Sequence, residues 1–457
     1  MTKAGLIRRA LISNIEAANQ ETGGCQCDTL IVLATLIPDT VYNRTSIMHL
    51  FFKGADMSAE IPITEKIIWI GINDRQTGLF EELWPIPNGI AYNSYMILDD
   101  KVAIVDAVKA LSAGQYLEKI KRLLGNSKKV DYLIFNHIEP DHSGAVKILL
   151  EAFPGMVIVG NQKTLDLLAH FYGIAENVLQ VEDGDSLELG RCRLKFILTP
   201  MVHWPETMMT YEETYKVLFS GDAFGGFMTL DDGIFDDEIA DLRYYEDEIL
   251  RYFTNVIGKY SVMVQKALPR IKDLDIAIVA PTHGPVWRKT PRHVIELYDR
   301  WSRQEAEDGV VIVYASMYGN TERMMEAVAH SLATEKAGIV KVHNVSRVHP
   351  SYVLADVWRY KALILGSPTY NTGLFPLMDH FIRLLENKML KDRIAGIFGS
   401  YGWSGGAMKE LTDFVKRLKW ELLEPVVEVK GAPFEEDLQN CSLLGRNIAE
   451  RLRAGRP

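Results

Sequence analysis

The sequence predicts a multidomain α/β protein whose strand-rich first part is followed by a doubly wound parallel sheet. The length of 457 residues corresponds to roughly two to four domains. From about residue 61 to 285, short apolar runs stand between Gly, Asn and Asp residues, which is typical of strands. From residue 309, five apolar runs alternate with five helical patterns, as in a parallel sheet covered by helices. We place the boundaries at 1–57, 58–308 and 309–457.

Composition excludes several classes of protein. Hydrophobic residues make up 47% and charged residues 24%, which rules out disordered and fibrous chains. A net charge of -10 argues against a nucleic-acid partner. No apolar run approaches the ~18 residues that span a bilayer, so no membrane partner is expected. Four cysteines and the lack of a signal-peptide pattern favour a cytoplasmic protein.

The expected elements of the first part follow from hydrophobic periodicity. Strands are expected at 67–72, 91–98, 102–106, 132–135, 195–198, 217–220 and 276–279, and helices at 114–124, 144–153, 162–172, 244–268 and 292–307. The helix at 292–307 leads into the last part.

The last part alternates regularly. Strands are expected at 309–315, 338–344, 361–366, 393–399 and 424–429, and helices at 322–335, 351–358, 374–387, 405–418 and 434–453. This order predicts that the strands are parallel and that their carboxyl ends meet at one sheet edge.

Metal-ligating side chains follow four of the expected strands. His137, Glu139, Asp141 and His142 lie within six positions after the strand at 132–135, and His203, Asp222 and His283 each follow a further strand. Open α/β architectures place their sites at such strand ends. The other histidines occur in helices or generic loops, and we expect them to have structural or surface roles: His49, His170, His293, His330, His343, His349 and His380.

The donor types indicate which metals fit. Burying two imidazoles and two carboxylates together would be costly without a cation. Seven donors are too many for one tetrahedral zinc ion but suit two open-sided ions that share a carboxylate. Imidazole and carboxylate without thiolate are compatible with iron, manganese or zinc.

The loop at 314–321 predicts a phosphate site. Its predicted contacts are Ser316, Met317, Tyr318, Gly319, Asn320 and Thr321, which offer hydroxyls, backbone N–H groups and a helix N-terminus. The loop lacks the lysine of a nucleoside-triphosphate loop and the glycines of a dinucleotide loop, so a single phosphate on a ring system fits better.

Two further loops leave the same expected sheet edge. They contribute Ser367, Pro368, Thr369, Tyr370, Asn371 and Gly373, and then Ser400, Tyr401, Gly402, Trp403, Gly405 and Gly406. Small hydrogen-bonding residues beside large aromatic rings suit a planar heterocycle. The alternative is that these loops are ordinary turn-rich connections.

These motifs resemble those of known families. His-x-Glu-x-Asp-His followed by separated His, Asp and His resembles the metallo-β-lactamase-like αββα sandwich, whose hydrolases carry His in place of Glu139. Glu139 itself, Gly-Asp-Ala-Phe-Gly at 221–225 and His-Gly-Pro-Val-Trp-Arg at 283–288 resemble the flavodiiron proteins. The three loops of the last part resemble those of flavodoxin.

The resemblance implies a function. His137, Glu139 and His203 would hold one non-haem iron ion, Asp141, His142 and His283 a second, and Asp222 would bridge them; these seven residues would form the catalytic site. FMN would lie in the three loops, with Trp403 or Tyr370 against its ring, and would pass electrons to a diiron centre with two iron ions per subunit. The enzyme would reduce O2 to water or NO to N2O.

The resemblance also implies partners. No Cys-x-x-Cys iron site follows the last domain, so a separate rubredoxin-like protein or reduced coenzyme F420 would donate electrons. Head-to-tail homodimers or dimers of dimers would bring the flavin of one subunit to the iron ions of the other. Two alternatives remain: a zinc-dependent hydrolase tethered to a flavodoxin-like module, and a non-catalytic electron carrier with a structural metal.

Three segments receive other interpretations. Segment 1–57 is interpreted as an extension from a mis-assigned start codon, because family chains begin near Met57. Cys25 and Cys27 lack partner ligands nearby in sequence and are interpreted as non-functional. The acidic run at 231–238 is interpreted as a solvated loop, or as a loop near the mouth of the site.

Overall fold

The computed structural model describes residues 61–125 and 129–455, which belong to one compact unit. The predicted extension at 1–57, with Cys25, Cys27 and His49, lies outside the described residues. The strand-rich part begins at Ile61 and ends with helix α10 (Pro291–Ser302), and the last part begins with strand β17 (Glu307–Tyr314).

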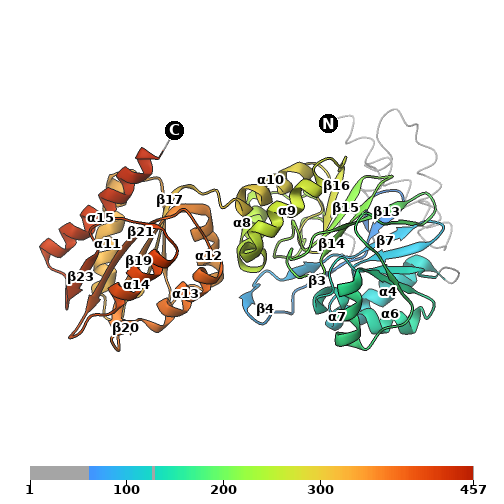
Figure 1. The fold of residues 1–457 in the computed structure, drawn as a ribbon, viewed down its shortest axis with the longest axis horizontal. Helices are drawn as coiled ribbons and strands as arrows, with labels where there is room; N and C mark the ends of the chain where they lie inside the picture. The colour runs from blue at the N-terminus through green and yellow to red at the C-terminus, as the bar shows by residue number, and fades with distance from the viewer. Residues whose placement is uncertain (1–60, 126–128, 456–457) are drawn as a thin grey trace, which may run out of the picture. The chain divides into compact units, whose positions relative to one another are not determined.

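Two sheets form the strand-rich part (Figure 1). One has the order β1 (Ile61–Pro62), β2 (Ile67–Trp69), β7 (Tyr95–Leu98), β8 (Val102–Val105), β9 (Tyr132–Ile134), β10 (Val157–Gly160) and β11 (Val178–Gln180). The other has the order β12 (Ser186–Glu188), β13 (Arg193–Leu198), β14 (Met208–Glu212), β15 (Val217–Gly221) and β16 (Ile278–Pro281). Smaller ribbons pair β3 (Ile72–Asp74) with β6 (Ile90–Tyr92), and β4 (Leu79–Phe80) with β5 (Trp84–Pro85).

Alternating side chains explain why these strands stack in layers. Ala103 and Val105 of β8 share a core with Val217 and Phe219 of β15, so this core fills the space between the sheets. The intervening residue Ile104 packs into the other core, toward the helices. Because both faces of β8 are buried, this strand is apolar along its whole length.

Helices cover the outer faces of the two sheets, which confirms the predicted layered fold (Figure 1). The helices beside the first sheet are α4 (Ala113–Leu124), α5 (Pro140–Ser143), α6 (Val146–Ala152) and α7 (Gln162–Tyr172). Those beside the second sheet are α8 (Leu242–Tyr252), α9 (Ser261–Ile271) and α10.

Two expected strands are each divided between two sheets. The expected strand at 91–98 forms the end of β6 and then β7, with Asn93 and Ser94 between them. The Asn93 side chain accepts a hydrogen bond from Trp69 Nε1 and donates one to the Pro281 carbonyl, which fixes the crossing point. The expected strand at 67–72 divides at Gly71, where a Cβ atom would lie 2.5 Å from the Tyr92 carbonyl oxygen.

Two helix expectations were wrong in extent. The expected helix at 244–268 is broken between α8 and α9 by a π-helical turn at Phe253–Ile257 and a 3-10 turn at Gly258–Tyr260. Asn255 donates side-chain hydrogen bonds to the carbonyls of Arg251 and Ser351, which stabilises the irregular turn. The helix expected at 292–307 ends at Ser302, because Gln304 adopts the left-handed conformation (φ 58°).

The last part is the predicted doubly wound sheet. Its strands are β17, β18 (Ile339–Asn344), β19 (Tyr360–Tyr370), β21 (Ile394–Tyr401), β22 (Glu421–Leu422) and β23 (Val427–Lys430). Their order is β18-β17-β19-β21, with β22 and β23 both pairing with β21, and all of these pairings are parallel. The short strand β20 (Gly373–Leu374) pairs with β19 in the antiparallel sense.

Five helices cover this sheet (Figure 1). They are α11 (Asn320–Thr334), α12 (Pro350–Arg359), α13 (Pro376–Asn387), α14 (Ala407–Arg417) and α15 (Glu435–Ala454). Alternate residues of β17 explain the coverage, since Val310 and Ile312 belong to one core and Val311 and Val313 to another.

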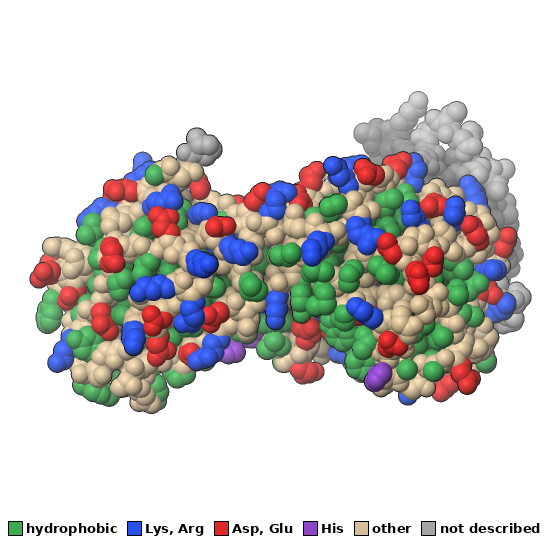
Figure 2. All heavy atoms as spheres, viewed as in Figure 1, with side chains coloured by type: hydrophobic (Ala, Val, Ile, Leu, Met, Phe, Trp, Pro, Cys, Tyr) green, Lys and Arg blue, Asp and Glu red, His purple; other side chains and the backbone are tan. Residues whose placement is uncertain are grey.

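The surface carries charges of both signs. Lys and Arg side chains are interspersed with Asp and Glu over the visible face (Figure 2). Among the described residues, no helix combines the length and the apolar character needed to cross a membrane.

Candidate metal centre and cofactor-binding loops

The ends of four strands, β9 of the first sheet and β13, β15 and β16 of the second, bring the seven predicted metal ligands together. The segment after β9 carries His137, Glu139, Asp141 and His142, while His203, Asp222 and His283 follow β13, β15 and β16. Their ligand atoms form two groups, one of His137, Glu139, His203 and Asp222 and one of Asp141, His142 and His283. All seven are more than four-fifths buried, and no other cluster with metal-ligand spacing occurs among the described residues.

The first group is compact. Nε2 of His137 lies 3.0 Å from Glu139 Oε2. Nε2 of His203 lies 3.2 Å from the same oxygen and 3.1 Å from Asp222 Oδ2. Donor atoms held at about 2 Å from one ion are separated by about 3 Å, so these distances suit a common metal.

The second group has a similar geometry. Nε2 of His142 lies 3.3 Å from Asp141 Oδ1 and 2.9 Å from Asp222 Oδ1. Nε2 of His283 lies 3.3 Å from Asp141 Oδ2 and 3.7 Å from Asp222 Oδ1.

Asp222 thus faces both groups with different oxygens. Its Oδ2 is directed to His203 and its Oδ1 to His142. Thr282 donates a hydrogen bond of 2.6 Å to Oδ1 and thereby orients the carboxylate. A carboxylate held this way can bridge two ions.

Outer hydrogen bonds fix which ring nitrogens face the centre. Nδ1 of His283 lies 2.8 Å from the Ala91 carbonyl, which can only accept, so Nδ1 carries the proton and Nε2 is left as a donor to a metal. Nδ1 of His137 lies 2.7 Å from Glu206 Oε1, and Nε2 again faces inward. Such outer partners are the usual support of metal-bound histidine.

The electrostatics of the cluster call for positive charge at its centre. Burial alone would lower the pKa of His142 and His203, but nearby carboxylates outweigh burial and raise both pKa values to about 9. Burial alone would raise the pKa of Glu139, but hydrogen bonds from His137 and His203 hold this pKa well below its usual range. Cations would satisfy these carboxylates while leaving the imidazoles neutral.

Unsatisfied atoms support the same conclusion. Both carboxylate oxygens of Asp141, both ring nitrogens of His142 and Nε2 of His283 are buried, and none of their short contacts has the geometry of a hydrogen bond. Such groups are costly unless they coordinate an ion. The residues therefore fit two metal ions with nitrogen and oxygen ligands.

Sequence reasoning missed three supporting residues. Glu206 and Thr282 contact candidate ligands directly, and Asp106 accepts hydrogen bonds from the backbone and side-chain nitrogens of Asn136, next to His137. Glu206 follows His203 by three positions and Thr282 precedes His283, so proximity to a candidate ligand was the available signal. Asp106 had no such signal, because only the pairing of β8 with β9 brings it close.

The three predicted loops meet at the carboxyl edge of the parallel sheet. Thr321 Oγ1, at the start of α11, lies 3.0 Å from Ser400 Oγ, and the Ala407 backbone N–H donates to Thr369 Oγ1 over 3.3 Å. Ser367, Pro368 and Ser400 are buried in β19 and β21, whereas Asn371, Gly402 and Trp403 are exposed. Further predicted contact residues lie in the same three loops: Met317, Asn320, Gly373, Tyr401 and Gly405.

This edge fits a planar, phosphorylated cofactor. Gly319 adopts a left-handed conformation (φ 87°) and donates its N–H to Ser316 Oγ, which curls the first loop below α11. Tyr318 and Trp403 are 90% and 84% exposed, and Tyr370 is 44% exposed. Exposed rings beside small hydroxyl residues offer stacking surfaces for a heterocycle.

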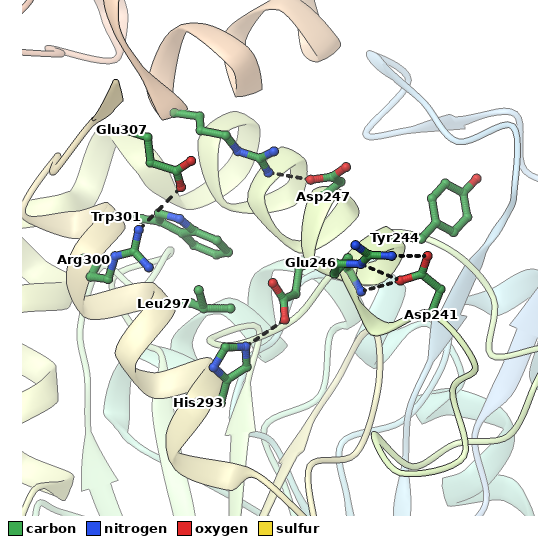
Figure 3. A pocket seen from close by; sticks show the side chains of 11 residues that line it. Asp241, Tyr244, Glu246, Asp247, His293, Leu297, Arg300, Trp301 and Glu307 are labelled. Carbon is green, nitrogen blue, oxygen red and sulfur yellow. Dashed lines mark hydrogen bonds and ion pairs between the residues drawn. The ribbon is translucent and has the colours of Figure 1, made fainter. Parts of the chain in front are cut away.

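A pocket elsewhere has a different chemistry. Figure 3 shows charged side chains of α8, α10 and the start of β17 that face one another. His293 lies 2.7 Å from Glu246, and Arg300 lies 3.5 Å from Glu307. These charges satisfy one another, so the pocket offers no open donor set. Side chains of the acidic run at 231–238 are also paired, for example Asp237 with Arg288 at 2.8 Å.

Comparison with known proteins matches both parts of the chain. Residues 90–284 match the family described as ODP family beta lactamase, and residues 312–445 match the flavodoxin family. A nitric oxide reductase of Moorella thermoacetica is 35% identical over 401 residues, which cover 87% of this chain and 100% of the relative. An anaerobic nitric oxide reductase flavorubredoxin of Aliivibrio salmonicida is 31% identical, covering 86% of this chain and 79% of the relative.

Solved structures show the same architecture. The rubredoxin oxygen:oxidoreductase of Desulfovibrio gigas superposes with a TM-score of 0.83 at 29% identity, covering 87% of this chain and 99% of that protein. The flavodiiron protein of Giardia intestinalis gives a TM-score of 0.83 at 27% identity, covering 88% of this chain and 98% of that protein.

Proposed function

Because the chain belongs to the flavodiiron protein family, we propose that it is an oxidoreductase that passes electrons from a donor through FMN to a non-haem diiron centre. There O2 is reduced to water or NO to N2O. One observation carries this proposal: the two oxygens of Asp222 face two separate ligand groups. A single shared carboxylate is what a two-metal centre requires.

The ligand set follows from the two groups. His137, Glu139 and His203 hold one iron ion, Asp141, His142 and His283 hold the other, and Asp222 bridges them. When bound, the iron ions supply one-electron chemistry and open positions at which a diatomic gas can be reduced.

Neighbouring side chains shape the centre. Thr282 orients Asp222, and Glu206 orients His137. The His283 ring packs edge-on against Phe80, with ring centroids 5.6 Å apart, and Tyr92 and Tyr252 also contact it. The Trp204 ring lies 5.1 Å from that of His137. These aromatic rings place apolar surface around the centre and limit the entry of water.

FMN occupies the loops at the edge of β17, β19 and β21. Ser316 and Thr321, the intervening backbone and the start of α11 bind its phosphate. Tyr370 and Trp403 contact its ring, and their exposure keeps one side of the site accessible to a redox partner.

A zinc hydrolase is the less favoured function. Hydrolases of the metallo-β-lactamase-like fold carry a second histidine where this chain has Glu139, and the relatives named above are reductases and oxidoreductases. An added anionic oxygen ligand favours a ferric ion over a Lewis-acidic zinc ion.

The electron donor, the subunit arrangement and the cellular location are further parts of the proposal. A rubredoxin-like protein or reduced coenzyme F420 donates electrons. The names of one relative and one solved structure refer to rubredoxin, which supports the first of these donors. Two subunits pair head to tail, so that the flavin of one approaches the iron ions of the other. The cytoplasm is the proposed location, in accord with two free, buried cysteines, Cys192 and Cys441.

An anaerobic turnover experiment tests the function. The purified, dithionite-reduced protein is mixed with O2 or with NO, and gas consumption, N2O and hydrogen peroxide are measured. We expect consumption of at least one gas without released peroxide. Hydrolysis of a thioester or lactam by a zinc-loaded protein that consumes neither gas would overturn the proposal.

A further inference from the structure

Two histidines of the centre differ in their outer hydrogen bonds. His137 Nδ1 donates to the carboxylate of Glu206 at 2.7 Å, whereas His283 Nδ1 donates to the neutral carbonyl of Ala91 at 2.8 Å. The two distances are nearly equal, so the difference lies in the charge of the acceptor. The two metal positions are therefore not electrostatically equivalent.

Glu206 is held firmly in this role. It is 1% exposed, and its Oε1 also accepts the Ile138 backbone N–H at 3.2 Å. Its main-chain carbonyl accepts a hydrogen bond from the Asn161 side chain at the start of α7. The turn after β13 thus carries His203 as a candidate ligand and, three residues later, the partner of His137.

We propose that Glu206 is a positioning residue that makes the His137 position the more tightly binding and the more easily oxidised of the two metal positions. This inference rests on the proposed diiron function. A carboxylate that accepts the Nδ1 proton raises the basicity of the imidazole, and a more basic ligand favours the ferric ion.

A comparison of the negative charges on the ligands and on the outer partners of His137 and His283 leads to the same order. Asp222 is shared, and each position has one further carboxylate ligand, Glu139 in one and Asp141 in the other. Glu206 adds one negative charge on the side of His137, and the Ala91 carbonyl adds none on the side of His283. In the half-reduced protein, the ferric ion should therefore occupy the His137 position and the ferrous ion the His283 position.

The variant Glu206→Gln tests this assignment, because it keeps the shape of the side chain and removes its charge. In the iron-loaded holoprotein we expect iron at one position to bind 10- to 100-fold more weakly. We also expect the half-reduced state, followed by electron paramagnetic resonance during a redox titration, to appear over a narrower potential range. The potential of the first reduction step should change little. The potential of the second step, in which the ferric ion of the half-reduced state is reduced, should rise.

Glu212→Gln is the matched control. Glu212 is also fully buried, but it accepts the backbone N–H groups of Thr214 and Tyr215 rather than a ligand proton. This variant should keep the wild-type titration. Glu206→Asp restores the charge and should recover part of the wild-type behaviour. Equal changes in Glu206→Gln and Glu212→Gln, or none in Glu206→Gln, would overturn the inference.

A second measurement uses the wild-type holoprotein, in case Glu206→Gln does not fold. A chelator removes half of the iron, and anomalous X-ray scattering from crystals locates the remainder. We expect the remaining iron between His137, Glu139 and His203. Iron remaining between Asp141, His142 and His283 would refute the assignment of Glu206, whereas a holoprotein that never contains two iron ions would refute the diiron function itself.

Discussion

Thr282 donates a hydrogen bond of 2.6 Å to Oδ1 of Asp222, the oxygen that also faces His142. Thr282 lies at the end of β16, immediately before His283, so one strand end supplies both a candidate ligand and the support of the bridging carboxylate. The orientation of the bridge therefore depends on the fold of β16 and not on the metal ions alone.

Replacing Asp222 should disrupt the metal centre. Asp222→Asn removes the charge and leaves only one carbonyl oxygen, so a second ion loses its shared ligand. We expect at most one iron ion per chain and at least a 100-fold lower rate of gas reduction, measured by elemental analysis and gas electrodes. Asp231→Asn, at a surface residue paired with Arg75, should retain the full iron content. Two iron ions in Asp222→Asn would contradict the bridging role.

Thr282→Val should impair turnover while the protein remains folded. Valine has nearly the shape of threonine but cannot donate to Asp222, and a hydrogen bond to a charged group contributes about 1.5–3 kcal/mol. We expect the rate of gas reduction to fall about 10- to 100-fold with unchanged far-UV circular dichroism. Thr282→Ser should restore most of the rate. A serine variant as slow as the valine variant would show that the methyl group, not the hydroxyl group, matters.

The third flavin loop should not tolerate a side chain at Gly406. Its φ of 156° is rare for other residues, and an added Cβ atom would lie 1.9 Å from the Thr372 carbonyl oxygen of the second loop. Gly406→Ala should therefore separate the two loops and lower the ratio of FMN to iron in the purified protein. Gly114→Ala, in α4 and away from the flavin loops, meets no atom within 4 Å and should keep the wild-type ratio. Equal ratios in both variants would contradict the assigned flavin site.

Much of the candidate site was predictable because its ligands adjoin apolar strands. Asp222 and His283 each follow a buried strand of one sheet, and the parallel ends of β15 and β16 meet at one edge, so their proximity followed from local patterns. His137 follows β9 of the other sheet, and the packing of the two sheets brings it to the same site. The residues that hold these ligands were harder to find. Asp106 approaches Asn136 only through strand pairing, and its sequence neighbours carry no corresponding motif.

The ends of helices and strands were predictable where neighbouring residues in the sequence determine them. The strands and helices of the last part follow their hydrophobic periodicity closely. The break between α8 and α9 was not predictable, because its cause is distant in sequence: Asn255 bonds to the Ser351 carbonyl, and Gly258 lies against the ring of Trp358. Tertiary contacts override local helix propensity there.

Lys388 should make stability depend on pH. Burial lowers its pKa to about 8, although Glu81 opposes the shift, and its ammonium group donates to the Asn255 carbonyl. Below pH 8, the buried charge of the Lys388 ammonium group therefore lowers the unfolding free energy. This loss disappears as pH rises toward the unfolded pKa near 10.5, because the folded protein then releases the proton before the unfolded chain does. Relative to Lys388→Met, the wild-type holoprotein should gain about 2 kcal/mol of unfolding free energy between pH 8 and pH 10.

Urea unfolding of both proteins across this pH range measures the difference in their unfolding free energies. The contributions of groups that titrate in both proteins cancel in this difference. A constant difference between wild type and Lys388→Met would show that the ammonium group is not buried at a cost.

The most direct test of the account is an anaerobic count of electrons per chain. The holoprotein, with its metal and flavin contents determined, is titrated with dithionite while flavin absorbance and iron oxidation state are recorded, and is then reoxidised with measured O2. The account predicts one FMN, two iron ions and four electrons per chain, returned to one O2 without hydrogen peroxide. Two electrons per chain, all on flavin and accompanied by zinc in place of iron, would contradict it.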